Sequence, residues 1–495
     1  MKKNKTNKLN IVLLIAVFAL IMFLRFWRVA DLFNFTFSEE MQALMAWEQI
    51  KNFHPIWIGV SAANINYYLG PGFTYLNAVL FYFSKGNPAI LAYFSSFLGV
   101  VTAVSIYYVA SRLFSKNVAL FSTIIYGCST LINFHDRRFW NPTPIPFITI
   151  WLVYSLIKAK ENTRWYIVTA ILVGAIFHTH LSLLLFMAPI LYSFFTNFKK
   201  IKLSTWIMGI VAYLAVTSPL LIFDIVHNYD NLLMPVRTIL GKQEADLSTF
   251  SLSNTFSHIK ELLSALGRLW FIKFSTNPQD QIVLESHMDK THGNISLSLL
   301  SVATLAWFYL KNRSEGYKIF LISLSVIMIA FILYPSYNPE YYLMSFLTLM
   351  TIVIGYALSS MSKKISIPVI SIFIAVNIAS TITMSGKYGL SVRQRLVEKT
   401  VTAIGGRSFH LTTEGELPAK EFAYAGWRYL LRNQGATPAQ STIDHVLDWI
   451  YPDEIQNEKP ELRLVISDTI RPTFKDKPIM EFKEEDYYGY IFENK

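Results

Sequence analysis

Two adjacent carboxylates, Glu39 and Glu40, stand a few residues after the first apolar stretch of the chain. Acidic side chains are scarce in this sequence, with 33 among 495 residues, and a carboxylate held beside a hydroxyl can take its proton as a general base. The alternative is the start of a helix, in which Ser38 caps the first turn and both acids face the positive end of the helix dipole. The residue types leave both interpretations open.

Three charged residues, Asp136, Arg137 and Arg138, occupy a short segment between two apolar stretches. Paired guanidinium groups at a membrane surface suit a phosphate or pyrophosphate group, which they can bind bidentately. The alternative is that both arginines extend towards the phosphates of surrounding lipids. Trp140, two residues further on, can pack on the face of a sugar or join the aromatic belt of the membrane interface.

Histidines and tyrosines stand at the ends of other apolar stretches. His178 and His180 can bind a divalent metal together with the carboxylates, but no ligand motif of specific spacing is present. A hydrogen-bonded structural role is therefore the stronger interpretation. Tyr341 and Tyr342 begin a late apolar stretch, where interfacial tyrosines are common. The sequence contains no Walker loop, dinucleotide fingerprint or nucleophile elbow, which argues against nucleotide-driven chemistry.

The elements that must position these residues are membrane spans. The chain is 53% hydrophobic and only 16% charged, which excludes an ordinary soluble protein. Stretches long enough to cross a bilayer recur at residues 9–28, 88–110, 117–133, 143–158, 164–178, 180–197, 203–222, 295–311, 318–334, 341–359 and 365–384. Lysines precede the first stretch and every second connection is basic. The positive-inside rule therefore predicts about eleven spans with a cytoplasmic N-terminus.

The net charge of +11 has the same origin. Basic residues are in excess only before residue 385, in the part that contains the spans, so no nucleic-acid partner is expected. The single cysteine, Cys128, lies in an apolar stretch. It excludes an internal disulfide and is expected to be a small core residue.

The expected fold class is a polytopic α-helical membrane protein with a small extracytoplasmic α/β domain at the C-terminus. The transmembrane domain takes residues 1–384 and has outer loops at 29–87, 134–142 and 223–294, while the C-terminal domain takes residues 385–495. Shorter elements are predicted from local patterns. They are a juxtamembrane or re-entrant helix at 67–84, a surface helix near 254–274, an amphipathic run at 420–434, and strands at 409–411, 462–467 and 487–492.

The chain resembles the GT-C membrane glycosyltransferases, specifically the bacterial protein O-mannosyltransferase-like and aminoarabinose-transferase-like group of the glycosyltransferase family 39 type. Three features carry the resemblance. The acidic motif follows the first span, and Gly70-Pro71 opens a juxtamembrane helix. A later run reads Arg137-Arg138-Phe139-Trp140-Asn141-Pro142-Thr143-Pro144-Ile145-Pro146. The tail with Gly405-Gly406-Arg407-Ser408-Phe409 is also similar. The family usually has an aspartate in the first loop, where this sequence has Ser38-Glu39-Glu40.

The resemblance implies a polyprenyl-phosphate-sugar-dependent glycosyltransferase of the cell membrane. It would carry out an inverting hexosyl or pentosyl transfer to an acceptor hydroxyl on the outer face. Glu40 aligns with the acid of the family and would act as base, with Glu39 as the alternative and Asp136 next. Arg137 and Arg138 would hold the departing lipid phosphate.

Five further residues are expected to bind substrate on the same resemblance: Tyr68, Trp140, Asn141, His180 and Tyr341. The acceptor remains open between a protein, a lipid and a glycan. No cofactor is required by the residues, and a divalent metal is the one alternative.

Two other classes of protein share this hydropathy. A transporter or lipid flippase should carry charges in the middle of its spans and show related halves, whereas the charges here gather at the outer ends of the predicted spans. The second rival is a GT-C-like scaffold that binds lipid-linked sugars without turnover, which the missing aspartate keeps open.

Overall fold

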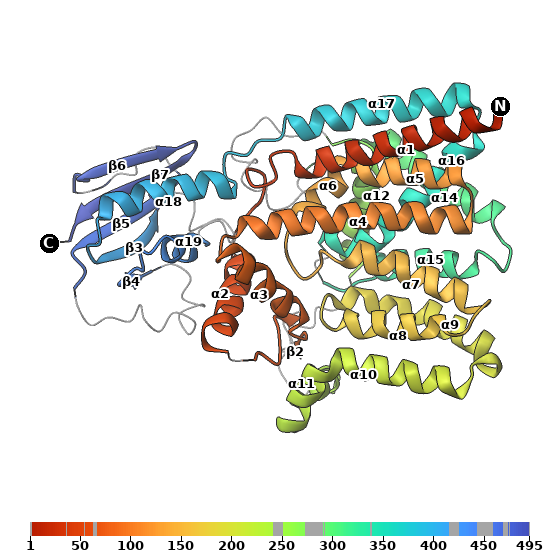
Figure 1. Cartoon of the computed structure of the whole chain (residues 1–495), viewed down its shortest axis with the longest axis horizontal. Helices are drawn as coiled ribbons and strands as arrows, with labels where there is room; N and C mark the ends of the chain where they lie inside the picture. The colour runs from red at the N-terminus through yellow and green to blue at the C-terminus, as the bar shows by residue number, and fades with distance from the viewer. Residues whose placement is uncertain are drawn as a thin grey trace.

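The computed structural model contains a bundle of long helices and a smaller C-terminal unit built on a sheet (Figure 1). The residues that it describes are 2–35, 37–53, 55–62, 67–240, 251–272, 291, 293–336, 339–414, 425–442, 459–468, 474 and 476–494. The bundle helices run roughly parallel. We call the end of the bundle next to the C-terminal unit the sheet end, and the opposite end the far end.

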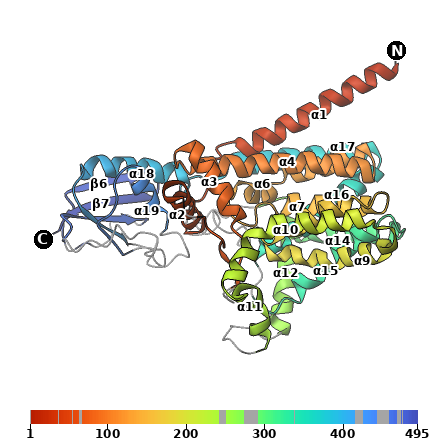
Figure 2. The same cartoon turned by 60° about the horizontal axis from the view of Figure 1, so that its bottom comes forward.

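The helices of the bundle begin and end as follows: α1 Lys2–Phe26, α4 Ala89–Leu113, α5 Lys116–Cys128, α6 Thr130–Arg137, α7 Ile145–Ala159, α8 Trp165–Ile176, α9 Met187–Asn197, α10 Leu203–Val226, α11 Asp230–Ile239, α12 Leu252–Arg268, α14 Ile295–Lys311, α15 Lys318–Ile332, α16 Met344–Ser360 and α17 Lys363–Ile382. Three 3-10 turns join them, at η2 Leu181–Phe186, η3 Phe198–Lys200 and η5 Glu340–Leu343. The first part of α1 diverges from the other helices (Figure 2). Its apolar side chains are exposed accordingly, with Ile11 at 58% and Ile15 at 63%.

Five helices in the described part of the chain are long and apolar enough to cross a membrane, and the bent pair of α5 and α6 would make a sixth. Five further apolar helices are shorter, between 10 and 17 residues. Each of the predicted spans coincides with one of these helices or pairs. The protein is therefore a multi-pass membrane protein, and the number of eleven crossings stays a prediction.

The break between α5 and α6 places the charged segment that the sequence singled out. The two helices meet at an angle of 63°, and Asn377 of α17 fills the gap. Its Oδ1 accepts the backbone N–H of Thr130 at 2.8 Å, and its Nδ2 donates to the carbonyl of Trp270 at 2.8 Å. Backbone groups inside an apolar bundle need such partners. The break thereby directs residues 135–137 to the sheet end.

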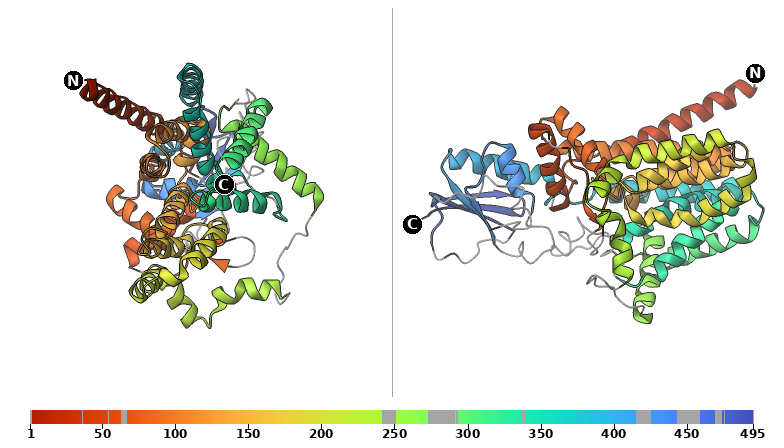
Figure 3. Two further views of the ribbon diagram at one scale, coloured as in Figure 1. Left: turned by 90° about the vertical axis from the view of Figure 1, so that its right-hand side faces the viewer. Right: turned by 90° about the horizontal axis from the view of Figure 1, so that it is seen from below.

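Two short helices, α2 (Phe37–Asn52) and α3 (Gly72–Ser84), lie between the bundle and the C-terminal unit (Figures 1 and 3). A two-stranded sheet of β1 (Ser61–Ala62) and β2 (Tyr67–Tyr68) connects them. The helix predicted within residues 67–84 is α3, and the one predicted near 254–274 is α12. The latter is buried on one side, through residues such as Leu262 and Leu266.

The C-terminal unit comprises α18 (Leu390–Ile404) and the residues that follow. Five strands form its sheet in the order β4-β3-β5-β7-β6. β3 runs parallel to β4 and β5, while β7 runs antiparallel to β5 and β6. The strand bounds are β3 Phe409–Glu414, β4 Gln440–Ser441, β5 Leu462–Ser467, β6 Met480–Glu484 and β7 Tyr487–Glu493, and a short helix, α19, takes Trp427–Asn433. The three predicted strands correspond to β3, β5 and β7. The first residues of the amphipathic run at 420–434 lie outside the described residues.

Candidate functional site

Four of the predicted site residues meet at the sheet end, where the loop after α6 contacts η5. The guanidinium carbon of Arg138 lies 3.9 Å from the centre of the Trp140 indole. The Trp140 ring packs edge-on against Tyr341, with centroids 4.5 Å apart, and the His180 ring lies 5.4 Å from Tyr341. Arg138, Trp140, Tyr341 and His180 therefore form one cluster of a cation and three rings, which we call the aromatic cluster.

The aromatic cluster is half-buried, so its rings have faces to offer. Tyr342 extends it, because its ring lies 5.1 Å from His180. The imidazole of His180 is held by its own turn, since Nδ1 accepts the backbone N–H of Ser182 at 3.2 Å. The guanidinium of Arg138 supplies a positive charge to the cluster.

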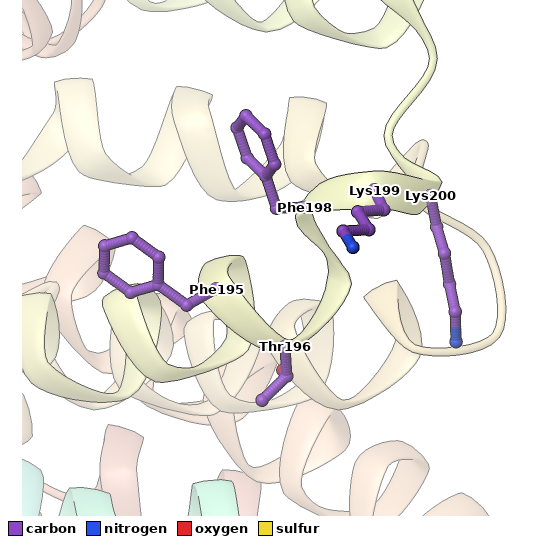
Figure 4. A pocket seen from close by; sticks show the side chains of 5 residues that line it. All are labelled: Phe195, Thr196, Phe198, Lys199 and Lys200. Atoms are coloured by element: carbon purple, nitrogen blue, oxygen red, sulfur yellow. The ribbon is translucent and has the colours of Figure 1, made fainter.

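A groove of about 350 Å³ lies between α3, α8, α10 and the start of α7, and its lining includes His178 and Thr179, the two residues before His180. Its lining is mainly apolar and includes Gly72, Phe73, Pro144 and Pro219. Another cavity, of about 430 Å³, lies at the far end around the turn from α9 to α10, lined by two phenylalanines, a threonine and two lysines (Figure 4). Of these two cavities, only the groove is lined by segments that carry the predicted site residues.

Glu40 is fully buried and contacts the C-terminal unit. Its Oε2 accepts the backbone N–H of Gly426 at 2.8 Å, and its Oε1 accepts that of Tyr429 at 3.0 Å. The helix-start interpretation expected a solvated acidic pair that faces the dipole of α2 itself, whereas both acids are buried. The N–H groups that Glu40 binds belong to Gly426, just before α19, and to Tyr429 within it, so Glu40 caps a helix distant in sequence.

Glu39 is also buried, with 1% of its surface exposed, and precedes Gln42 on α2 by three residues. Residues three apart share a helix face, and Gln42 accepts a hydrogen bond from Thr74 of α3 at 3.0 Å. Phe73, the residue before Thr74, stacks on Phe139, with the ring centroids 4.6 Å apart. A continuous chain of contacts thus joins the face of α2 that carries Glu39 to the loop of the aromatic cluster.

Asp136 lies in a buried ion pair. Arg25, near the end of α1, donates to its Oδ2 from Nη2 at 2.6 Å and from Nε at 3.1 Å. The hydroxyl of Tyr126 donates to Oδ1 at 3.1 Å, and Arg25 also donates to the carbonyl of Gly127 at 2.7 Å. Asp136 therefore joins α6 to α1 and α5, and the sequence had not singled out Arg25.

The other predicted site residues make structural contacts. Arg137 is buried and donates to the carbonyl of Leu24 at 2.9 Å. The Asn141 amide donates to the carbonyl of His178 at 3.5 Å. The backbone of Tyr68 exchanges two hydrogen bonds with the Asn231 side chain, at 2.7 and 3.0 Å. These residues border the aromatic cluster or hold loops near it.

A second charged group at the sheet end was missed by the sequence reasoning. Glu340, which precedes Tyr341, is buried at 3% exposure and accepts hydrogen bonds from Arg268 Nε at 3.0 Å and from His135 Nε2 at 3.3 Å. Arg268 also pairs with Glu261. In the described part of the structure, the buried Nδ1 of His135 has no partner. The pattern of an acid at the start of an apolar stretch could have pointed to Glu340.

The described residues contain no group of three or more His, Cys, Asp or Glu side chains that could hold a metal ion. His178 is engaged on both ring nitrogens. Nδ1 accepts the N–H of Gly72 at 3.0 Å, and Nε2 lies 2.7 Å from the carbonyl of Val216. Its role in the structure is to fix the Gly70-Pro71-Gly72 turn, as the structural interpretation predicted.

With this geometry established, the chain can be compared with known proteins. Residues 69–223 match the model of the dolichyl-phosphate-mannose-protein mannosyltransferase family. The matched segment contains the Gly70-Pro71 turn, Arg138, Trp140 and His180, whereas the acidic pair and Tyr341 lie outside it. Among curated proteins, none matches the chain in sequence. The match over this part of the chain confirms the resemblance to the GT-C membrane glycosyltransferases that was stated from the sequence.

The fold is similar to that of ArnT. The structure of ArnT from Cupriavidus metallidurans bound to undecaprenyl phosphate superposes with a TM-score of 0.63 at 10% identity, covering 97% of this chain and 97% of that chain. The same protein in the apo state gives a TM-score of 0.59 at 10% identity, covering 99% and 98%. The oligosaccharyltransferase of Archaeoglobus fulgidus in its apo form reaches 0.48 at 12% identity, covering 93% of this chain and 69% of that one.

Proposed function

We propose that the protein is a glycosyltransferase that moves a hexosyl or pentosyl group from a polyprenyl-phosphate donor to an acceptor hydroxyl. The observation that carries the proposal is the aromatic cluster, because it places one guanidinium among sugar-sized ring faces, on segments whose neighbouring residues line an apolar groove. In the similar fold of ArnT, the bound molecule is undecaprenyl phosphate. A polyprenyl phosphate consists of a charged phosphate and an apolar chain. The site offers a guanidinium for the phosphate and an apolar groove for the chain.

Each part of the donor has a counterpart in the site. Arg138 binds the phosphate through charge-assisted hydrogen bonds, and the apolar groove takes the first units of the polyprenyl chain. Trp140 and Tyr341 pack against the sugar. Arg137 is buried against the end of α1, so we assign the phosphate to Arg138 and a structural role to Arg137.

The transfer itself needs a base and a stabilised leaving group. The base takes the proton of the acceptor hydroxyl, whose oxygen attacks the anomeric carbon as the bond from that carbon to the phosphate oxygen breaks. The polyprenyl phosphate departs with the bonding electrons, and Arg138 stabilises its charge. Of the acidic pair, we assign the base to Glu39, because the face of α2 that carries it is joined through Gln42, Thr74 and Phe73 to the loop of the aromatic cluster. The carboxylate of Glu40 binds two main-chain N–H groups, and Asp136 is held by Arg25.

The acceptor reaches this site from the side of the C-terminal unit, which we place outside the cytoplasm. The distribution of basic loops supports this topology. Lys160, in one basic loop, donates to the carbonyl of Glu315 in another at 2.9 Å, and Lys199 and Lys200 lie at the far end as well (Figure 4). The N-terminus of α1 is at the same end and is therefore cytoplasmic.

The test is transfer by the purified protein from a panel of labelled polyprenyl-phosphate sugars, with donor binding measured separately. Arg138→Ala should weaken donor binding about ten- to hundredfold, since a charged hydrogen bond contributes roughly 1.5–3 kcal/mol. Arg237→Ala is the matched control, because Arg237 makes an exposed ion pair with Asp230.

Three results decide between the functions. Transfer of label to an acceptor or to water, lost in the Arg138 variant, supports the glycosyltransferase. Donor binding without any transfer would instead make the protein a binder of lipid-linked sugars. Movement of the intact labelled lipid between the leaflets of a vesicle would make it a flippase.

A further inference from the structure

The C-terminal unit forms hydrogen bonds to the chain before, within and after the acidic motif. We call this set of contacts, at Phe33, Phe35, Glu40 and Trp47, the grip. Before the motif, the carbonyl of Phe33 accepts the N–H of Leu390 at 2.9 Å, and the carbonyl of Phe35 accepts Nη1 of Arg393 at 3.1 Å. Within the motif, the carboxylate of Glu40 binds the start of α19. Phe33, Phe35 and Glu40 are therefore held by segments that follow them by more than 350 positions.

Glu40 completes a helix start that has no cap of its own. The first N–H groups of a helix lack partners within the helix, and α19 has no side-chain cap at Gly426. Glu40 supplies both oxygens to the N–H groups of Gly426 and Tyr429. The close approach depends on Gly426, which has a φ of 93° and where a Cβ would lie 2.5 Å from the carbonyl oxygen of Phe35.

Arg393 fixes the other side of the same contact. It is buried to 1% exposure and donates to the carbonyl of Ala425 at 2.6 Å, to that of Phe35 and to the hydroxyl of Tyr487 at 2.9 Å. Its guanidinium carbon lies 4.9 Å from the centre of the Trp427 ring. One side chain of α18 thus joins the first loop, the start of α19 and β7.

A third contact extends the grip along α2. The hydroxyl of Tyr429 donates to the carbonyl of Gly86 at 2.7 Å and accepts from Nε1 of Trp47 at 2.8 Å. Trp47 and Glu40 are seven residues apart, about two helical turns, so they share one face of α2. That face is turned to α19, whereas Gln42 contacts α3.

We propose that Glu40 is a positioning residue, and that the C-terminal unit holds α2 in the orientation that places Glu39 for catalysis. Adjacent residues on a helix point about 100° apart, so fixing Glu40 on α19 fixes the direction of Glu39. This proposal rests on the proposed function, with Glu39 as the base. It makes the C-terminal unit a part of the catalytic apparatus.

The experiment uses the full chain with four substitutions: Glu39→Gln, Glu40→Gln, Tyr429→Phe and, as control, Glu484→Gln. Glu484 pairs with Arg395 and Lys399 of α18 inside the C-terminal unit. Amide hydrogen exchange is followed in segments 37–44 and 425–433 without substrate. For each variant, kcat, the KM for the donor and the pH dependence of kcat/KM are measured as well.

Glu40→Gln should speed exchange in both segments, because an amide accepts at only one of the two positions and presents a donor to the other N–H. A loss of one charge-assisted bond predicts an increase of about ten- to hundredfold. The value of kcat should fall by a similar factor at nearly constant KM, with the acid limb of the pH profile unmoved. Tyr429→Phe should change the same quantities in the same direction. Glu39→Gln should lower kcat by about 10²–10⁴-fold while exchange stays at the wild-type rate.

Two outcomes would overturn the proposal. If Glu40→Gln loses turnover while exchange is unchanged, Glu40 acts in the chemistry itself. If exchange rises in both segments while kcat keeps its wild-type value, the grip is structural and uncoupled from catalysis. A wild-type protein that transfers no sugar would refute the proposed function, and with it the catalytic part of this proposal, but the exchange rates would still decide whether Glu40 anchors α19.

Discussion

Replacing Asp136 by asparagine is expected to destabilise the bundle rather than to remove a catalytic base. The side chains of Arg25 and Asp136 are exposed by 0% and 5%, and their closest atoms are 2.6 Å apart. Asparagine keeps the shape of the aspartate but leaves the Arg25 guanidinium charged and buried without a counter-ion. Breaking a buried pair on one side costs about 3–5 kcal/mol.

The structure also predicts how the loss can be recovered. Arg25→Met combined with Asp136→Leu removes both charges, and such exchanges of a buried pair for apolar residues are often close to neutral. The hydroxyl of Tyr126 and the carbonyl of Gly127 then lose a partner, at about 1–3 kcal/mol each. The double variant should therefore be less destabilised than the two single variants together.

The assay is unfolding of the purified protein in mixed micelles by titration with a denaturing detergent, followed by tryptophan fluorescence. Transfer activity is measured below the transition. Asp230→Asn is the control, because Asp230 forms an exposed ion pair with Arg237, and such a pair contributes at most about 1 kcal/mol. The reasoning is refuted if Asp136→Asn unfolds like the wild type but has lost transfer, since Asp136 would then act on substrate.

A further prediction concerns topology. Cysteines placed at the exposed positions Asn52 and Thr437 should react with an impermeant maleimide from outside the cell, one at Glu161 should react only after permeabilisation, and labelling of the Glu161 position in intact cells would reverse the topology, with the buried Cys128 silent throughout.

Apolar helices were the predictable part of this fold, because length and hydropathy are local properties of a stretch. The strands β5 and β7 were predictable for the same reason, since their β-branched and aromatic residues are contiguous. The pairing of segments was not. Glu40 and Gly426 are 386 residues apart, and nothing near either residue indicates the other.

The residues of the candidate site also fall into two groups: those that a local sequence pattern predicted and those that only the structure revealed. Arg138 and Trp140 were recognisable because they share one motif, and His180 and Tyr341 because each begins an apolar stretch. The partners that give Asp136 its structural role were missed, although an arginine inside an apolar stretch is itself a signal that a buried acid lies elsewhere. Arg25 supplies that signal. Without the structure, Asp136 and Glu40 both remained candidates for a base.

The pairing of Arg25 with Asp136 also has a consequence for the order in which the chain is made. The two residues are 111 positions apart, so at about 5–20 residues per second Arg25 is synthesised roughly 5–20 s before its counter-ion. During that time α1 carries a charge that no later helix has yet neutralised. Insertion of α1 into the bilayer must therefore wait until α6 has been made. Until then, Arg25 must stay in a polar environment, at the bilayer surface or inside the translocation machinery. Newly made chains that lack Asp136 should therefore accumulate at this early stage and be degraded, before any defect of the finished enzyme is felt.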